Sequence, residues 1–253
     1  MSAVLIEKGP DLEVRLENLS FGFGVKQLFV DLNLTFPAGQ WTVLLGPSGC
    51  GKSTLLRLIA GSLKPASGQI TFNQKAAPKA PVAWMAQDDL LLPWLTVTEN
   101  ILLGARLRKT VDAEKEQRVH QLLAEIRLEA EKDALPQTLS GGMRQRVALL
   151  RTLMEKRPVI LMDEPFSALD ALTRLRLQNL FARLVKKTTV VLVTHDPLEA
   201  LRLGHRIIVL KDRPAVAMHQ LDLSGERPRD PAASEMALLY KSLLNHLMKP
   251  KLG

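Results

Sequence analysis

The chain has 253 residues, a composition ordinary for a globular protein, and a formal net charge of +8 spread over scattered lysines and arginines. No apolar run approaches the roughly 20 residues that cross a bilayer, and residues 1–11 lack the basic-then-apolar order of a secretory signal. With one cysteine, an internal disulfide is excluded, so we expect a cytosolic protein whose basic surface faces anionic lipid and not nucleic acid.

Alternating apolar residues near the amino terminus predict half-buried antiparallel strands. Residues on one side of a strand recur at every second position, and two sets in this segment do so. The first set is Leu12, Val14 and Leu16, and the second is Leu28, Val30, Leu32, Leu34 and Phe36. We therefore expect an antiparallel β subdomain at the amino end.

Five later runs are short and almost wholly apolar, which is typical of parallel strands that are covered by helices on both faces. They span residues 41–45, 82–86, 159–162, 190–193 and 207–210. Helical stretches lie between them, at 53–60, 112–128, 142–155, 171–186 and 197–203. This alternation predicts an α/β fold with a mostly parallel sheet.

Two segments stand apart from the alternation, and we expect both to belong to one domain that spans residues 1–253. Residues 95–138 are predominantly helical and separate two of the buried runs, so they predict a helical subdomain inserted into the core. Residues 224–253 form a short tail whose amphipathic helix packs either on this chain or on a partner. The apolar residues of that helix are Met236, Leu239, Tyr240, Leu243, Leu244 and Leu247.

Residues 46–53 fit the glycine-rich loop that holds nucleotide phosphates, because they follow an apolar run and precede a predicted helix. The glycines let successive backbone N–H groups curl toward a phosphate at the helix end. Lys52 is suited to reach the β- and γ-phosphates, and the hydroxyl of Ser53 to bind Mg²⁺. A glycine-rich turn without a ligand is the weaker alternative. The predicted nucleotide-binding residues are Gly46, Pro47, Ser48, Gly49, Cys50, Gly51, Lys52, Ser53 and Thr54, within a P-loop NTPase core.

Two adjacent carboxylates, Asp163 and Glu164, follow the apolar run at 159–162. The carboxyl ends of parallel strands are where α/β proteins form their ligand sites. Since adjacent side chains point differently, Asp163 suits Mg²⁺ and Glu164 suits a base that polarises water. Such a pair on its own would be ordinary surface charge, and the phosphate loop before it favours the functional interpretation.

Ser140, Gly141 and Gly142 open the predicted helix at 142–155. Serine is a common helix cap. The same residues can also present backbone N–H groups, at a positive helix end, to a phosphate. The three residues alone do not decide between these interpretations.

Together with several further matches, these motifs stand in an order that resembles the nucleotide-binding subunit of ATP-binding cassette (ABC) transporters, over about residues 12–225. In that family the Leu-Ser-Gly-Gly segment is the signature motif. The further matches are the adenine-stacking aromatic at Phe23, the Q-loop at Gln87, the D-loop aspartate at Asp170 and the switch histidine at His195. Phe23 and Met143 replace the family's commoner tyrosine and glutamine, and we expect both to be tolerated.

The resemblance implies that the chain binds ATP with Mg²⁺ and hydrolyses it. It also implies that two copies pair head to tail, so that Ser140 of one copy covers the γ-phosphate held by Lys52 of the other. The catalytic residues would be Glu164, His195 and Gln87, and the metal would be held by Ser53, Gln87 and Asp163.

The partners implied by the resemblance are a second nucleotide-binding subunit, in a homodimer, and a separate membrane permease. An extracytoplasmic solute-binding protein would be an indirect partner, and no nucleic acid is expected. The dimer would then lie at the cytoplasmic face of the membrane as a peripheral subunit.

Two segments resemble the importers of nitrate, taurine, alkanesulfonates and thiamine-pyrimidine precursors, namely residues 91–94 (Leu-Leu-Pro-Trp) and 171–174 (Ala-Leu-Thr-Arg). Other subunits recognise the cargo, so it cannot be read from this chain. We expect Trp94 and Leu95 to contact the permease, although burial in the chain's own core accounts for Trp94 equally well. Cys50, close to the phosphates, further suggests a test for sensitivity to thiol oxidation.

Two other functional classes fit less well. A cassette ATPase that acts on DNA or ribosomes would carry long heptad arms, zinc-binding cysteines or a second cassette, and this sequence has none of these. A binding module without activity would lack part of the site, whereas Lys52, Ser53, Asp163, Glu164 and His195 are all intact. The transport ATPase is therefore the favoured interpretation.

Overall fold

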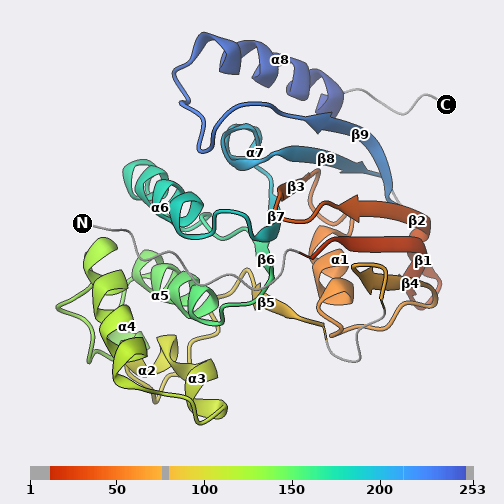
Figure 1. Ribbon diagram of the computed structural model, residues 1–253. Coiled ribbons are helices and arrows are strands. Elements are labelled where there is room, and N and C mark those ends of the chain that lie inside the picture. The colour runs from red at the N-terminus through yellow and green to blue at the C-terminus, as the bar shows by residue number, and fades with distance from the viewer. Residues whose placement is uncertain (1–11, 76–79, 213, 249–253) are drawn as a thin grey trace.

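The smaller of two β-sheets is antiparallel and lies at the amino end of the chain in the computed structural model, which describes residues 12–75, 80–212 and 214–248 (Figure 1). Its strand order is β2-β1-β4, with β1 at Val14–Phe23, β2 at Lys26–Phe36 and β4 at Ser67–Phe72. The predicted antiparallel pairing of the first two strands is confirmed. The sequence did not predict the third strand, β4. Only its last two residues are buried, so apolar and polar residues do not alternate along it.

The predicted phase of β2 is wrong at Val30, which is 43% exposed, while its neighbour Phe29 is fully buried. The pairing with β1 shifts between Leu32 and Phe29, because β2 has one more residue than β1 between these pairs. Asp31 takes a left-handed backbone conformation there, with φ at 46°, and its N–H donates to the hydroxyl of Ser20 at 3.0 Å. A β-bulge of this kind reverses which side chains face the core.

The larger sheet has the strand order β5-β6-β7-β3-β8-β9. All five predicted apolar runs lie in it as neighbouring parallel strands, which confirms the mostly parallel sheet. Among its described strands, only β9 pairs antiparallel, at the edge beside β8. The bounds are β3 Trp41–Leu45, β5 Val82–Met85, β6 Val159–Asp163, β7 Thr189–Thr194, β8 Arg206–Lys211 and β9 Val216–Asp222.

Apolar side chains on both faces of the larger sheet are buried, but against different elements. Trp41 and Val43 of β3 join a cluster with helices α5, α6 and α7, whereas Leu44 joins a cluster with α1 and the smaller sheet. Period-two alternation therefore divides the core into two layers. The helix bounds, which agree with the predicted ones to within three residues, are α1 Lys52–Ile59, α4 Ala113–Glu125, α5 Gly141–Met154, α6 Ala171–Leu184 and α7 Pro197–Leu203.

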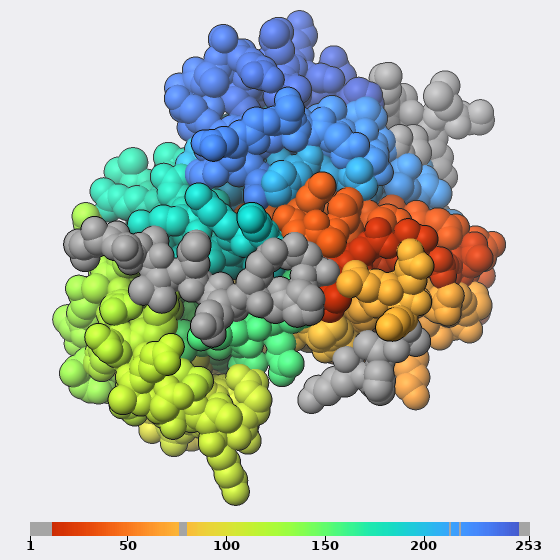
Figure 2. All heavy atoms as spheres, viewed as in Figure 1, coloured from red at the N-terminus to blue at the C-terminus, as the bar shows by residue number. Residues whose placement is uncertain are grey.

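The segment at 95–138 is helical and packs on α5, at the opposite side of the molecule from the smaller sheet (Figures 1 and 2). Besides α4 it holds α2 at Val97–Ile101, α3 at Leu103–Leu107 and a 3₁₀ turn at Pro136–Thr138. The tail helix α8, at Ser234–Met248, packs on this chain's own α7 and buries Met236 and Leu243 in the core. Within the described residues, no helix combines the length and apolarity needed to cross a bilayer.

Candidate functional site

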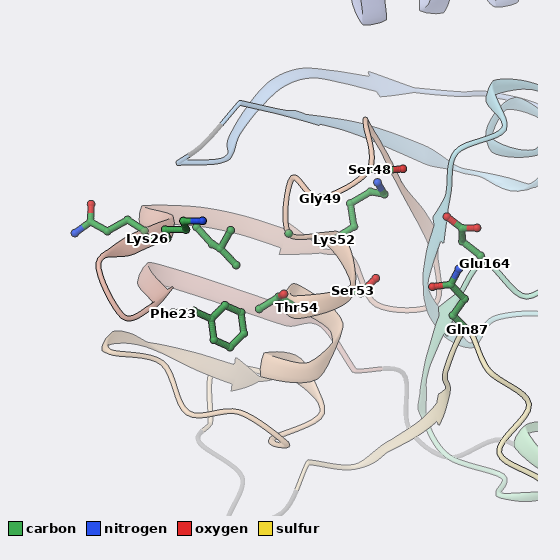
Figure 3. Close-up of a pocket in the computed structure, with 12 residues that line it drawn as sticks. Phe23, Lys26, Ser48, Gly49, Lys52, Ser53, Thr54, Gln87 and Glu164 are labelled. Carbon is green, nitrogen blue, oxygen red and sulfur yellow. The ribbon is translucent and has the colours of Figure 1, made fainter.

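A cavity of about 670 Å³ lies where the start of α1, the β1–β2 hairpin and the loops after β5 and β6 meet (Figure 3). Phe23 and Lys26 stand at one end of it and Gln87 and Glu164 at the other, with Lys52 between them. The carboxyl ends of the parallel strands form one wall, as in other α/β ligand sites. The lining residues are Phe23, Lys26, Gln27, Leu28, Ser48, Gly49, Gly51, Lys52, Ser53, Thr54, Gln87 and Glu164.

The glycine-rich loop is packed so closely that its glycines are required. A Cβ atom on Gly46 would lie 2.1 Å from the carbonyl oxygen of Leu210. One on Gly51 would lie 2.8 Å from the ring of Phe29, and the φ of Gly51 is 104°, which side chains disfavour. Gly51 caps α1 without a side-chain hydrogen bond, and the first turn of α1 holds no acidic residue. The amino end of α1 therefore keeps N–H groups and positive charge for an anion.

Lys52 is 6% exposed and lies against the loop. Its ammonium donates hydrogen bonds to the carbonyl oxygens of Gly46 at 2.8 Å and Pro47 at 2.9 Å. The thiol of Cys50 points into the core and is 3% exposed, so an oxidant reaches it only poorly. Burial thus argues against the suggested oxidation sensitivity, whereas the backbone of Cys50 remains part of the loop.

Asp163 ends the buried strand β6 and Glu164 follows it, and their side chains have different surroundings. Asp163 is 5% exposed, and burial raises the pKa of its carboxyl, while a hydrogen bond from Ser53 opposes that rise. Glu164 has a left-handed backbone, with φ at 49°, which turns its side chain into the cavity. Non-glycine residues in this conformation are uncommon and are concentrated at functional sites.

His195 follows strand β7, and its Nδ1 atom lies 3.1 Å from Oε2 of Glu164. The two strands β6 and β7 are parallel neighbours, so the residues after them meet at the same sheet edge. The imidazole is 64% exposed, whereas the carboxylate is 20% exposed. The pair thus combines a semi-buried carboxylate with a histidine that is open to a ligand.

The hairpin side of the cavity combines the predicted Phe23 with two residues that the sequence analysis missed, Lys26 and Gln27. Phe23 is 55% exposed and meets Phe21 edge to face, with ring centroids 5.0 Å apart. Across the hairpin Phe23 pairs with Lys26, which brings Lys26 and Gln27 to the cavity as well. Gly24 was the signal in the sequence for this pairing, because glycine favours a two-residue hairpin turn. Such a turn at positions 24 and 25 places Lys26 opposite Phe23.

Ser140 and Asp170 do not line this cavity. Ser140 is exposed and caps α5, where its hydroxyl accepts from the N–H of Met143 at 3.3 Å. Asp170 caps α6 in the same way, accepting from Thr173 at 3.0 Å. In the described part of the chain these residues therefore act as caps, and their predicted contact with a phosphate stays a prediction.

Gln145 connects α5 to the loop that carries Glu164, and the sequence analysis did not single it out. This side chain is 5% exposed, donates to the carbonyl oxygen of Glu164 at 3.2 Å and accepts from the N–H of Ala168 at 3.0 Å. A Cβ atom on Gly142 would lie 3.3 Å from the carbonyl oxygen of Ala168, so the glycine keeps the two segments close. The amino end of α5 and the loop after Glu164 thus form one connected unit.

Trp94 is 71% exposed, so the interpretation that it is buried in the chain's own core is wrong. Two side chains of α5 hold the segment that precedes Trp94. Arg144 pairs with Asp89 at 2.9 Å, and Arg151 donates to the carbonyl oxygen of Leu90 at 2.8 Å. Leu90 itself is 61% exposed, so an anchored loop presents two large apolar side chains to the surroundings.

Comparisons with known proteins agree with this geometry. A family model described as ABC transporter matches residues 29–167. The aliphatic sulfonates import ATP-binding protein SsuB of Delftia acidovorans is 45% identical over 91% of this chain and 93% of that protein. A protein of the same name from Pseudomonas syringae pv. syringae, SsuB 1, is 40% identical over 94% of this chain and 96% of that protein.

Solved structures agree in fold. A dimeric ATP-binding cassette in a post-hydrolysis state, bound to ADP and Pi, superposes with a TM-score of 0.73 at 31% identity, over 84% of this chain and 100% of that one. An ATP-binding subunit of an ABC transporter superposes with a TM-score of 0.77 at 26% identity, over 93% of this chain and 99% of that one. With the motifs in the same order around one cavity, this chain belongs to the ABC transporter family and is an ATP-binding subunit that hydrolyses ATP.

Proposed function

We propose that this chain drives an importer for aliphatic sulfonates, as a homodimer bound to a separate membrane permease. The names and the 40–45% identity of the two relatives support the cargo class. They favour transport over an ATPase that acts on nucleic acid or ribosomes. The observation that carries the ATP-driven part of the proposal is one cavity that joins the phosphate loop to Glu164 and Gln87.

Mg²⁺ is the metal we propose for this site, held by Ser53, Gln87 and Asp163. The fit is chemical: all three offer oxygen atoms, which Mg²⁺ prefers, and the Ser53 side chain lies close enough to lower the pKa of Asp163. A buried carboxyl whose pKa is raised by burial also gains from a nearby cation, which favours its ionised form. When bound, the ion supplies positive charge to the β- and γ-phosphates.

Glu164 is the residue we propose as the base that polarises the attacking water. It lines the cavity that holds the phosphate loop, and its Oε2 lies 3.1 Å from His195. His195, which is open to a ligand, then orients the γ-phosphate and the water. Lys52 and the amino end of α1 stabilise the charge of the phosphates. At the other end of the cavity, the half-exposed ring of Phe23 offers a surface on which the adenine stacks.

The proposed dimer is head to tail, with Ser140 of each copy facing the phosphate loop of the other. Support comes from the exposed cap at the amino end of α5, which does not line its own chain's cavity. A solved relative with 31% identity is dimeric. Asp170, at the exposed amino end of α6, would lie at the same interface.

The proposed permease contact is the loop with Leu90, Trp94 and Leu95, which is held on α5. Leu90 and Trp94 are exposed, and Leu95 is half-buried. Such side chains on an anchored loop are suited to a protein partner. This arrangement makes the chain a peripheral subunit at the cytoplasmic face of the membrane. The solute-binding protein that selects the sulfonate would act on the permease from the opposite side.

Glu164→Gln tests the catalytic part of this proposal. The amide keeps the shape of the side chain but cannot accept a proton, so ATP binding should remain while turnover falls by roughly 10²–10⁴. Phosphate release and ATP affinity are measured on the purified full chain. Near-normal turnover in the variant would remove Glu164 from the catalytic role.

Growth tests the transport part. Cells that lack this chain should fail to grow with ethanesulfonate as the only sulfur source, and the wild-type chain should restore growth while Glu164→Gln should not. Growth on sulfate should be equal in all three strains. If loss of the chain leaves growth on ethanesulfonate unchanged, aliphatic sulfonate is not its cargo, and uptake of taurine and nitrate is measured in the same strains.

A further inference from the structure

A second cavity, of about 60 Å³, lies next to the nucleotide cavity and shares only Glu164 with it. We call it the rear cavity. Its volume has room for one or two water molecules, and polar groups surround it, which are the conditions for ordered water. The residues that line it are Glu164, Phe166, Ser167, Arg174, Thr194, His195, Asp196 and Glu199.

Glu199 is the buried acid of the rear cavity. It lies in the first turn of α7 and is 6% exposed. Its Oε2 atom accepts from the side-chain amide of Gln178 at 3.1 Å, whereas Oε1 has no hydrogen-bond partner among the described residues. Buried carboxylate oxygens are almost always hydrogen-bonded, so Oε1 is expected to bind water in this cavity.

Burial, more than the charges nearby, sets the pKa of Glu199. Burial raises its pKa to about 7, against the opposing effect of the hydrogen bond from Gln178. The negative charge of Asp196 raises the pKa further, and the positive charge of Arg174 lowers it. Glu164 and His195 face the same cavity from the loops after β6 and β7. From within α7, Arg202 acts through Gln178, to which it donates at 3.0 Å.

We propose that Glu199 receives the proton that ATP hydrolysis leaves on Glu164, by way of His195 and water in the rear cavity. This inference rests on the proposed role of Glu164 as the base. Glu199 touches no substrate atom and acts only through the Glu164–His195 pair. Its function is to return Glu164 to the ionised form before the next turnover.

The oxygen of the attacking water forms a bond to the γ-phosphorus, and the bond from this phosphorus to the bridging oxygen of ADP breaks, leaving its electron pair on ADP. One proton of the water moves to Glu164. That proton then passes to the ionised carboxylate of Glu199 and from there to solvent, so no oxidant or further reactant is needed.

Glu199→Gln tests the inference, because glutamine keeps the size and can still bond Gln178 but cannot take up a proton. In the wild type, Glu199 accepts a proton only when ionised, that is, above about pH 7. The ratio of wild-type to variant turnover should therefore approach 1 at pH 6 and rise to roughly 10 at pH 8.5. A merely structural role would change turnover by the same factor at every pH, and such a constant ratio would overturn the inference.

Asp196→Asn gives a second readout that does not depend on how well Glu199→Gln folds. Asparagine caps helices as well as aspartate does, so α7 should form normally. Loss of the negative charge lowers the pKa of Glu199, so the rise of turnover with pH should move to lower pH in this variant. An unmoved profile would contradict the inference. If the wild-type chain hydrolyses no ATP at any pH, the proposed function fails and not this inference alone.

Discussion

Helices α1 and α5 both begin in glycine-rich segments, and neither carries an acidic residue in its first turn. By contrast, α2, α4 and α7 each hold one or two acids there, which offset the positive end of the helix, and α6 has the acidic cap Asp170. The amino end of α1 opens into its own chain's cavity, whereas that of α5 is exposed and capped only by Ser140. We interpret the difference as two separate roles. The positive end of α1 binds an anion within its own chain, whereas the positive end of α5 binds an anion that is held by a second chain.

Of the changes that compare the two helix ends, removing the charge at the α1 end should have the largest effect. Lys52→Ala takes away the ammonium beside the phosphate loop, so turnover should fall by roughly 10²–10³, and ATP should bind more weakly. Both quantities are measured on the purified chain, by phosphate release and by calorimetric titration with ATP.

Lys26→Ala is the matched control, because Lys26 lines the same cavity from the β1–β2 hairpin, at the end with Phe23. It should alter ATP affinity modestly and leave turnover at saturating ATP close to that of the wild type. Equal losses in the two variants would show that the cavity responds to total charge, and the special role of the α1 end would fail.

A mixing experiment tests whether the α5 end acts on a second chain. Ser140→Arg blocks the α5 end, and Lys52→Ala disables the α1 end, so each variant alone should be inactive. In an equal mixture, half of the dimers pair the two variants and keep one intact site. Activity should then recover to roughly a quarter of the wild-type rate if the two sites of a symmetric dimer work independently.

The control is a mixture of Lys52→Ala with a chain that carries both substitutions, which contains no intact site in any pairing. It should stay at background. Absence of recovery in the first mixture, with heterodimers demonstrated by two different affinity tags, would mean that each site belongs to a single chain.

The sequence was most informative where the signal is local. The apolar runs of β3, β6 and β7 are buried at every residue, so continuous hydrophobicity identified them. The phosphate loop was equally readable, because its strand, loop and helix are contiguous. Phe23, Gln87 and Glu164 came from motifs, and the cavity brings all three together.

Errors arose where a distant contact decides the structure. The bulge at Asp31 depends on Ser20 in the neighbouring strand, so alternation within β2 could not reveal it. Nothing in the sequence around Gln145 indicates that this side chain hydrogen-bonds the loop after Glu164. The exposure of Trp94 likewise depends on how α5 holds the preceding loop, which spacing along the chain does not encode.

The smallest expected effect separates the two possible roles of Ser140, as a cap and as a ligand of phosphate. Ser140→Ala removes the hydroxyl that accepts from Met143 and should cost about 1 kcal/mol of stability, as loss of a helix cap does. If the α5 end also binds a phosphate of the partner chain, turnover should fall by roughly 2- to 10-fold, the value of one hydrogen bond.

Asp112→Ala is the matched control, because Asp112 caps α4 by accepting from the N–H of Lys115 at 2.9 Å, and it does not line the nucleotide cavity. It should lower the unfolding free energy by a similar amount while leaving turnover unchanged. ATP-dependent dimerisation, followed by size-exclusion chromatography in a Glu164→Gln background, should weaken with Ser140→Ala and not with Asp112→Ala. Were both variants to lose stability, turnover and dimerisation in parallel, the effect of Ser140 would be that of any helix cap, and α5 would differ from α1 only in lacking a ligand.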